Sequence, residues 1–303
     1  MIRARVLGSA AGGGLPQWNC GCVNCTCVRT NDGRVTRRTQ DSIAIGTGAG
    51  DRWLLVNASP DVLRQIDAFD ALWPRGRRDT PIAAVALTNG DLDHVLGLFS
   101  LREWQPLRVL ASTRVRDGLV DHNAMFRTLA RTSDQVAWDN LMLGQEVAVE
   151  DVGVGVTAFA VHGKLPVHLV GVTEPSPEDN VALRIRDLAG DGPSLVVATS
   201  VGSLDGIDVL LDGAAAVFVD GTFWSDDELL LQGLGAARAS DMAHVPVGGK
   251  DGTLARLARV RAARRVYTHI NNTNPMLRGG SPERAAVEQA GWEIAFDGME
   301  ISL

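Results

Sequence analysis

The sequence predicts a layered α/β fold, in which strands and helices pack around a shared core. Short apolar runs rich in β-branched residues recur along the 303 residues, Gly- and Pro-bearing turns separate them, and helical runs lie between several of them. Predicted strands span residues 3–7, 42–45, 53–56, 82–87, 107–111, 154–161, 168–172, 181–185, 195–198, 215–219, 265–268 and 292–295. No linker or repeat divides the chain, so we expect residues 1–303 to form a single domain.

Three segments predict helices. Residues 60–69 follow Ser59, a suitable N-cap, and place Pro60 at the first helical position. Residues 281–291 open on a Ser-Pro pair and end on a glycine, so they carry both a start and a stop signal. Residues 92–104 continue from a predicted strand through a tight turn and have helical character.

Composition and charge exclude two classes of protein. The formal charge is −7, with 36 acidic and 29 basic residues, and the basic pairs are short and scattered, which argues against a nucleic-acid binder. The first residues alternate polar and apolar as a strand does, rather than forming a secretory signal. No stretch reaches the roughly 18 apolar residues of a membrane span, so we expect a cytoplasmic protein without direct membrane insertion.

Four candidate ligands follow the buried strand predicted at residues 82–87. They are Asn89, Asp91, Asp93 and His94, within six residues at the point where strand turns into helix. Each could alone be a turn or capping residue. Because three acids and imidazoles fall within four residues, we favour a metal site.

All four cysteines fall within eight residues, in a loop at about residues 18–28. They are Cys20, Cys22, Cys25 and Cys27. In a reducing compartment this density favours a structural zinc over disulfides, and the Cys22-x-x-Cys25 spacing suits two thiolates on one ion. Spare thiols or a redox pair are the alternatives, but nothing around Cys22 indicates the helix cap that a thioredoxin-type motif requires. Cys27 is the least certain ligand, because four thiolates so close together surround one ion awkwardly.

Two further candidates lie at the ends of predicted strands much later in the chain. Asp220 ends residues 214–220, and His269 ends residues 265–269. Alone, Asp220 would be read as an Asp-Gly turn and His269 as a histidine capping a strand. Taken jointly with Asp93 and His94, we interpret both as metal ligands.

The segment from Asn89 to His94 resembles the HxHxDH signature of the metallo-β-lactamase superfamily. Asp93 and His94 match it, while Asn89 and Asp91 replace the two leading histidines. Residues 16–20, 57–61, 220–224, 243–246 and 268–275 together, in their order and spacing, resemble the family of coenzyme PQQ synthesis protein B. The resemblance implies the αββα sandwich of the superfamily as the fold.

The resemblance also implies roles for individual residues. Asp220 matches the superfamily's bridging carboxylate, His269 its last metal histidine, and His244 a histidine near the metal that can act as a catalytic acid or base. His162 falls near the third histidine of the first metal site. That site has lost two imidazoles, so a second metal is expected to bind weakly or not at all, and the roles of His162 and His168 stay open.

The fourth ligand of the cysteine site also stays open. In related phosphodiesterases of the superfamily, a histidine three residues after the last active-site histidine completes a CxCxxC zinc site. That position here is Asn272, so Cys27, Asn272 or another group would complete the shell.

The active site would then hold one metal, with ligands drawn from Asp91, Asp93, His94, Asp220 and His269. Mixed imidazole and carboxylate ligation with open positions is typical of non-haem Fe(II) oxygenases, although zinc or manganese also fits. The resemblance implies pyrroloquinoline quinone (PQQ) biosynthesis by O₂-using hydroxylation of a tyrosine-derived ring. The expected partner is the tyrosine-containing precursor peptide or its processed product; presentation by a carrier protein of the pathway stays open.

Two alternatives to this hydroxylase remain. A metal-dependent hydrolase resembling the phosphodiesterases would suit the fold, but the altered first metal site counts against it. A non-catalytic carrier that aids transport of PQQ or its precursor to the periplasm would bind its ligand without turnover.

Overall fold

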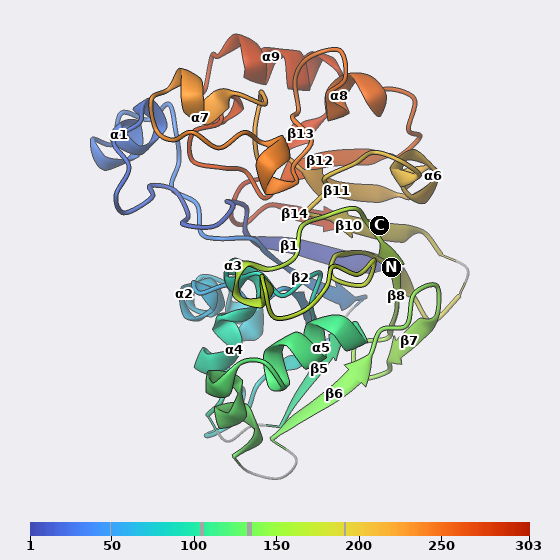
Figure 1. Cartoon of the computed structure of the whole chain (residues 1–303). Helices are drawn as coiled ribbons and strands as arrows, with labels where there is room; N and C mark the ends of the chain where they lie inside the picture. Colours follow the sequence, from blue (N-terminus) through green and yellow to red (C-terminus); the bar gives the residue numbers. More distant parts are fainter. Residues whose placement is uncertain (49, 104–105, 132–134, 191) are drawn as a thin grey trace.

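Two mixed β-sheets stack face to face, and helices cover the outer face of each (Figure 1). The computed structural model describes residues 1–48, 50–103, 106–131, 135–190 and 192–303. This arrangement is an αββα sandwich, so the predicted fold class is confirmed.

The first sheet has the strand order β14-β1-β2-β3-β4-β5-β6. Its strands from β3 to β6 run parallel, and the remaining neighbours are antiparallel. The strands are β1 (Ile2–Gly8), β2 (Ser42–Thr47), β3 (Trp53–Val56), β4 (Ile82–Ala86), β5 (Leu107–Ala111), β6 (Val136–Asn140) and β14 (Glu300–Ser302).

The second sheet has the order β13-β12-β11-β10-β9-β8-β7. Its parallel part runs from β10 to β13. The strands are β7 (Glu146–Val149), β8 (Val154–Ala160), β9 (Val181–Asp187), β10 (Ser194–Ala198), β11 (Ala216–Asp220), β12 (Arg264–Thr268) and β13 (Glu293–Ile294).

The main core lies between the two sheets. Val6, Ile43 and Leu54 of the first sheet share one buried cluster with Val156 and Ile185 of the second. Side chains alternate between the faces of a strand, so each strand that contributes to this core also has a face for the helices outside it. The sheets are therefore buried on both sides, which explains their nearly continuous apolar runs.

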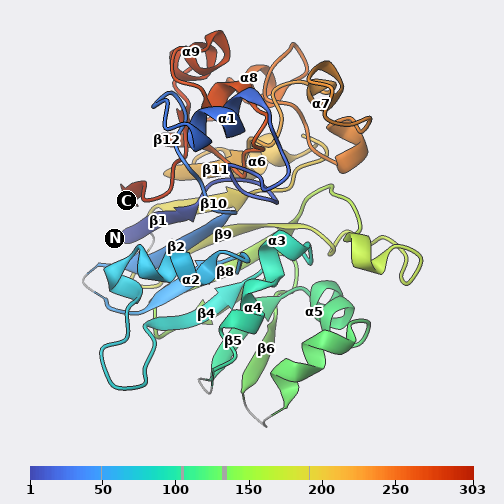
Figure 2. The ribbon, with the colours of Figure 1, turned by 90° about the vertical axis from the view of Figure 1, so that its left-hand side faces the viewer.

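The helices form two outer layers (Figures 1 and 2). Val62 of α2 and Val115 of α5 pack on the first sheet, and Val28 of α1, Leu211 of α6 and Val287 of α9 pack on the second. Among the described residues, no helix combines the length and apolar character needed to cross a membrane. The helices are α1 (Val23–Arg29), α2 (Val62–Asp67), α3 (Leu92–Val95), α4 (Gly97–Ser100), α5 (Thr113–Val120), α6 (Ile207–Leu211), α7 (Glu228–Leu231), α8 (Thr253–Arg256) and α9 (Pro282–Gln289).

One predicted strand is wrong and three strands were not predicted. Residues 168–172 lie in the connection between β8 and β9, which projects from the body in Figure 2, and their only helical element is the short 3-10 turn Val167–Leu169. Only Leu169 in this segment packs inside, so its apolar residues do not mark a strand. The strands β6, β7 and β14 lie at sheet edges. An edge strand is partly exposed and lacks the apolar run that reveals a central one.

The predicted helix ends differ in accuracy. Ser281 caps α9 by accepting a hydrogen bond from the Arg284 N–H at 3.1 Å, as predicted. The predicted cap at Ser59 is wrong, because α2 begins at Val62 after Asp61. The Ser59 hydroxyl instead donates to Gln65 Oε1 at 3.1 Å.

The helix predicted over residues 92–104 is divided into α3 and α4. The break falls at Leu96, and the N–H of Gly97, the first residue of α4, donates to the Ala58 carbonyl at 2.8 Å. A Cβ at Gly97 would lie 2.3 Å from the Ser59 carbonyl oxygen, so only glycine fits this approach. The last predicted residue, Trp104, lies outside the described residues.

The sheet topology brings the candidate ligands together. Asp93 and His94 follow the parallel strand β4 of the first sheet, while Asp220 ends β11 and His269 follows β12 in the second. Ligands usually bind at the carboxyl ends of parallel strands, where such loops meet.

Candidate metal centre

His94 is fully buried and presents one ring nitrogen to the site. Its Nδ1 lies 2.8 Å from Asn89 Oδ1 and 3.2 Å from Thr88 Oγ1. Because an amide oxygen can only accept, Nδ1 carries the proton and Nε2 keeps its lone pair. Nε2 has no hydrogen-bond partner among the described residues and lies 3.9 Å from Asp93 Oδ2.

His269 is held in the same manner. Its Nδ1 lies 2.8 Å from Thr222 Oγ1, and its Nε2 lies 3.3 Å from Asp93 Oδ2. The Thr222 hydroxyl donates to Asp220 Oδ1 at 2.5 Å, so its oxygen accepts the proton of His269 Nδ1. The Nε2 of His269 is therefore the nitrogen that can bind a metal, and Thr222 orients it.

Asp93, His94 and His269 form a group that fits a metal ion. One ligand atom of each lies within 4.8 Å of the others. Both histidines point Nε2 at the site, and the buried Nε2 of His94 lacks the partner that a buried polar atom normally has. The donor set of two imidazoles and one carboxylate suits Fe(II) or zinc.

Burial and neighbouring charges shift the pKa values of all three residues in this group. Burial lowers the pKa of His94 to about 4, so its imidazole is neutral at physiological pH and free to bind a metal. Burial opposes ionisation of Asp93, but the neighbouring His94 and His269 outweigh it and hold the pKa of Asp93 below its usual range. Burial likewise opposes a charge on His269, yet Asp220 and Asp93 hold the pKa of His269 well above its usual value.

Asp220 and His244 form a second, adjoining pair. Asp220 Oδ2 accepts hydrogen bonds from His244 Nδ1 at 2.5 Å and from the Val201 N–H at 3.0 Å. Its Oδ1 accepts from the Thr222 N–H at 3.0 Å and from the Thr222 hydroxyl. Asp220, His244 and His269 also lie close enough together to share an ion. However, the four acceptor positions of Asp220 are already used, so a metal would have to displace one donor.

The His244 ring lies beside the metal-binding group. It stacks on His269 with ring centroids 5.6 Å apart and an interplanar angle of 27°. Because Asp220 accepts the proton of Nδ1, Nε2 of His244 is left with a lone pair. His244 therefore suits the catalytic acid or base role expected of it better than a structural role.

A cavity of about 380 Å³ opens onto these residues. Asp91 also lines it, but lies outside both groups of close ligand atoms. Burial raises the pKa of Asp91, and the nearby Asp93 raises it further. The structure thus brings Asp93, His94 and His269 together and leaves Asp91 beside them. Residues that line the cavity include Lys164, Val167, His168, Ser200, Phe223, Met242 and Asn271.

Asn89 stands where the superfamily signature has its first metal-binding histidine, and it takes part in a network of amide hydrogen bonds. Asn89 Nδ2 donates to Asn180 Oδ1 at 3.2 Å and to Ser200 Oγ at 3.1 Å. Asn89 Oδ1 accepts from the Asp91 N–H at 3.0 Å as well as from His94. His162 is exposed and lies outside the groups of close ligand atoms found in the described residues. The part of the chain that the structure describes therefore forms no group of close ligand atoms around His162.

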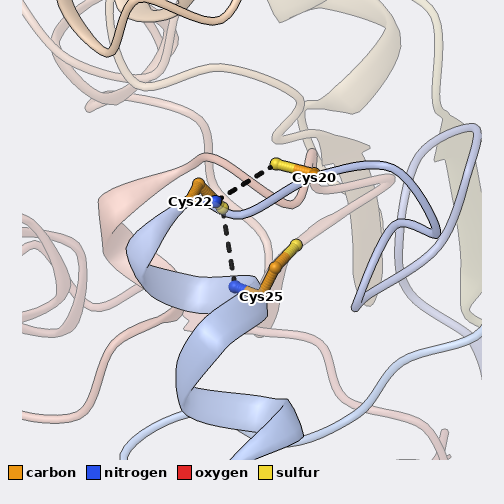
Figure 3. A group of neighbouring side chains, drawn as sticks. All are labelled: Cys20, Cys22 and Cys25. Atoms are coloured by element: carbon orange, nitrogen blue, oxygen red, sulfur yellow. Dashed lines mark hydrogen bonds between the residues drawn. The ribbon is translucent and has the colours of Figure 1, made fainter.

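Three of the four cysteines form a separate group (Figure 3). The sulfur atoms of Cys20, Cys22 and Cys25 lie within 4.8 Å of one another. The Nδ2 atom of Asn272 donates to all three sulfur atoms at 3.2 to 3.5 Å, so the Asn272 amide lies against the group; only its oxygen could bind a metal. Burial raises the pKa of Cys25 to about 12, so a cation is needed to stabilise its thiolate.

Two expectations about the cysteines are corrected. Cys22 does cap a helix: its sulfur accepts the Cys25 N–H at the start of α1 (Figure 3). Cys27 does not join the other three, and its sulfur lies 3.3 Å from Asp32 Oδ2. Residues two apart on a helix point in nearly opposite directions, so α1 cannot aim both Cys25 and Cys27 at one ion.

Asn24, which connects the cysteine group to the metal centre, was not predicted from the sequence. This buried side chain donates to the carbonyls of Asn272 at 2.9 Å and Asn274 at 2.8 Å. Asn274 in turn donates to the Gly221 carbonyl at 2.9 Å. Thr222 was missed too, although its place directly after Asp220-Gly221 was a usable signal.

Known proteins resemble this chain along its whole length. The model of the beta-lactamase superfamily domain matches residues 52–270. Coenzyme PQQ synthesis protein B of Ruegeria pomeroyi is 42% identical over 301 residues, covering 98% of this chain and 99% of the relative. The protein of the same name from Methylobacterium nodulans is 44% identical over 304 residues, covering 100% of both chains.

Solved structures agree. The crystal structure of Zn²⁺-bound PqqB from Methylobacterium extorquens has a TM-score of 0.91 and 40% identity, covering 99% of this chain and 100% of that one. A diphosphatase from the PhnP family has a TM-score of 0.68 at 18% identity, covering 99% and 96%, and so shares the fold. The chain therefore belongs to the coenzyme PQQ synthesis protein B family, within the beta-lactamase superfamily.

Proposed function

We propose that this protein acts in PQQ biosynthesis as a mononuclear Fe(II)-dependent hydroxylase of a tyrosine-derived ring. Its substrate is the precursor peptide or its processed product. Family membership supports the pathway. The observation that carries the chemistry is the group of Asp93, His94 and His269, because two histidines and one carboxylate with open positions are typical of non-haem iron oxygenases.

The reaction requires more than the aromatic substrate. Ring hydroxylation by O₂ places one oxygen atom in a C–H bond and reduces the other to water, so a two-electron reductant is also consumed. Bound Fe(II) would supply the redox chemistry that activates O₂. The protein would hold that ion through Asp93, His94 and His269.

The surrounding residues would position the substrate and move a proton. Phe223 and Met242 line the cavity and offer apolar contacts to an aromatic ring. His244 lines the same cavity, and its Nε2 would accept the phenol proton while Asp220 stabilises the resulting imidazolium. We therefore assign Asp220 to holding His244 rather than to the metal.

The hydrolase alternative predicts a second metal. Zinc is the ion named for the related Methylobacterium extorquens structure, and zinc suits the ligands of this chain as well. However, Asn89 fills the first metal position with four hydrogen bonds and provides no imidazole there. A dinuclear hydrolytic site is accordingly less well supported than a mononuclear one.

The test compares wild type with His269→Ala after anaerobic loading with Fe(II). Metal content is measured by mass spectrometry, and O₂ labelled with ¹⁸O is then admitted with a reductant and tyrosine-containing substrate. We expect zinc at the cysteine site of both proteins, iron in the wild type only, and one labelled oxygen atom in its product. His162→Ala, at an exposed position outside the cavity, should keep both iron and activity.

The alternatives give different outcomes. Two zinc ions lost together in His269→Ala, with turnover of a phosphodiester and no labelled product, would identify a hydrolase. Ligand binding without turnover, unchanged by Asp93→Ala, would identify a carrier.

A further inference from the structure

Lys164 places a positive charge in the cavity that the metal centre does not use. It lies in the connection between β8 and β9 and lines the same cavity as His244 and His269. Within the described residues, its ammonium group forms no hydrogen bond or ion pair. A half-buried lysine at a cavity whose ammonium group has no close partner is available to an anionic ligand.

The backbone around Lys164 is fixed to the metal-binding loop. Asn180 Nδ2 donates to the Lys164 carbonyl at 2.8 Å, and Asn180 Oδ1 accepts from Asn89. The preceding Gly163 packs against Asn180 so closely that a Cβ would lie 2.4 Å from its side chain. The position of Lys164 is thereby coupled to the turn that carries His94.

His168 lines the same cavity as Lys164 and fixes the segment that carries both residues. Its Nε2 is buried and has no hydrogen-bond partner among the residues described. Its ring and the Pro166 ring both lie over Gly90, where an added Cβ would be 3.7 Å from His168 Cε1 and 3.3 Å from Pro166 Cγ. Lys164 and His168 thus stand on one segment that packs on the Asn89–Asp91 turn.

Two of the three nearby carboxylates already have other partners and so would not bind the ammonium group of Lys164. Asp93 would bind the metal, and Asp220 is satisfied by His244 and by backbone donors. Asp91 remains, and Lys164 favours its charged form through space, although the described residues include no ion pair between the two. The competing explanation is therefore that Lys164 only balances the charge of Asp91.

We infer that Lys164 binds a carboxylate of the substrate and so orients its aromatic ring toward the metal centre. This inference rests on the proposed function. The apolar side chains of Leu92 and Val167 are 53% and 74% exposed and line the same cavity, where they can contact the ring. Lys164 acts as a specificity-determining residue that selects ring substrates with an acidic group.

The test measures equilibrium binding of two probes to zinc-loaded protein, in which no oxidation occurs. The probes are L-tyrosine and tyramine, which differ only in the carboxylate. We expect the wild type to bind L-tyrosine about tenfold more tightly than tyramine, as one charge-assisted contact implies. Lys164→Met should abolish this preference without changing metal content, while Lys164→Arg should retain much of it.

The double variant Lys164→Met with Asp91→Asn separates the two explanations. If Lys164 only balances Asp91, the double variant regains the preference and the inference is overturned. A wild type without carboxylate preference, or a Lys164→Met protein that keeps it, also overturns it. Turnover with ¹⁸O-labelled O₂ is measured separately. If Lys164→Met loses the carboxylate preference but the wild type never hydroxylates the substrate, only the hydroxylase proposal is refuted. If Lys164→Met hydroxylates fully with an unchanged KM, only the carboxylate contact is refuted.

Discussion

Single hydrogen bonds fix which nitrogen of each histidine is available in the metal centre. Asn89 Oδ1 can only accept, and the Thr222 hydroxyl has already given its proton to Asp220. Each therefore takes the Nδ1 proton of its histidine and leaves Nε2 of His94 and His269 directed to the site. An imidazole oriented in this way does not need to reorganise when the metal binds.

Asp220→Asn tests whether Asp220 is a positioning residue. An asparagine keeps one acceptor oxygen, but its NH₂ group would face His244 and reverse the tautomer of that ring. We expect iron content to stay near that of the wild type while kcat falls about 100-fold or more. Metal analysis and a pH–rate profile check this. Loss of iron together with activity would instead make Asp220 a ligand.

Glu228 predicts a pH-dependent stability outside the metal ligands. Its carboxylate is buried and accepts hydrogen bonds from the Trp224 N–H, at 2.6 Å, and from the Thr273 hydroxyl. Burial raises its pKa from 4.5 to about 7. The folded state therefore holds this proton more tightly than the unfolded chain, and its stabilisation is lost as pH rises from about 4.5 to about 7, by up to about 3 kcal/mol.

Glu228→Gln should flatten that dependence, since an amide can accept from Trp224 and donate to Thr273. Urea unfolding of metal-free protein at pH 5 and pH 8 measures the effect. Glu150→Gln, at an exposed position, serves as the control. The same decline in Glu228→Gln as in the wild type would show that other groups cause it.

At the scale of elements, the short helix α1 links the cysteine group to the metal centre. Cys22 caps its first turn, and Asn24 donates to the carbonyls of Asn272 and Asn274. These contacts fix residues 272–274, which follow His269 in the loop after β12. The cysteine site therefore supports the position of a candidate ligand without touching the cavity.

Cys25→Ser and Cys27→Ser provide a matched pair on α1. Cys25 lies in the sulfur group, whereas Cys27 is also buried but faces Asp32. We expect Cys25→Ser to lose most of the structural zinc and Cys27→Ser to keep it, because a hydroxyl is a poor replacement for a thiolate ligand. Zinc content by mass spectrometry measures both. Equal loss in the two variants would place Cys27 in the zinc shell after all.

At the scale of the whole molecule, the two ends of the chain close the first sheet. Figures 1 and 2 show the termini near each other, and β14 pairs with β1 with Ala4 opposite Ile301. Arg38 reinforces this closure: its buried Nη1 donates to Ser9 Oγ at 2.9 Å and to the Ala295 carbonyl. Contacts between residues so far apart in sequence form only when both sheets are in place.

Ile301→Ala should therefore destabilise the entire sandwich. Ile301 is 2% exposed and belongs to the core between the sheets. Removing it should lower the free energy of unfolding by about 2 to 4 kcal/mol. Urea unfolding measures this against Ser302→Ala, an exposed neighbour in β14 that should change stability by less than about 0.5 kcal/mol. If Ile301→Ala lowered the free energy of unfolding as little as Ser302→Ala does, β14 would contribute through its backbone alone.

Local sequence patterns predicted the elements that lie deep in the fold. Strands β4 and β11 are apolar runs because both of their faces are buried, and polar residues follow or end each run. The edge strands β6 and β14 were missed because partial exposure removes that pattern. The segment at residues 168–172 misled for the opposite reason, since its valines are exposed at the end of a loop.

The fold class and the kinds of ligand could be predicted from sequence patterns, because apolar periodicity is local and because Asp93 and His94, like three of the cysteines, lie close together along the chain. Which of these groups meet depends on the tertiary structure. The strand order places His269 against Asp93, the helical turn of α1 directs Cys27 away from Cys25, and the β8–β9 connection returns Lys164 to the cavity. Side-chain encounters between distant segments depend on sheet topology and helix rotation, and neither is encoded in the periodicity of any single segment.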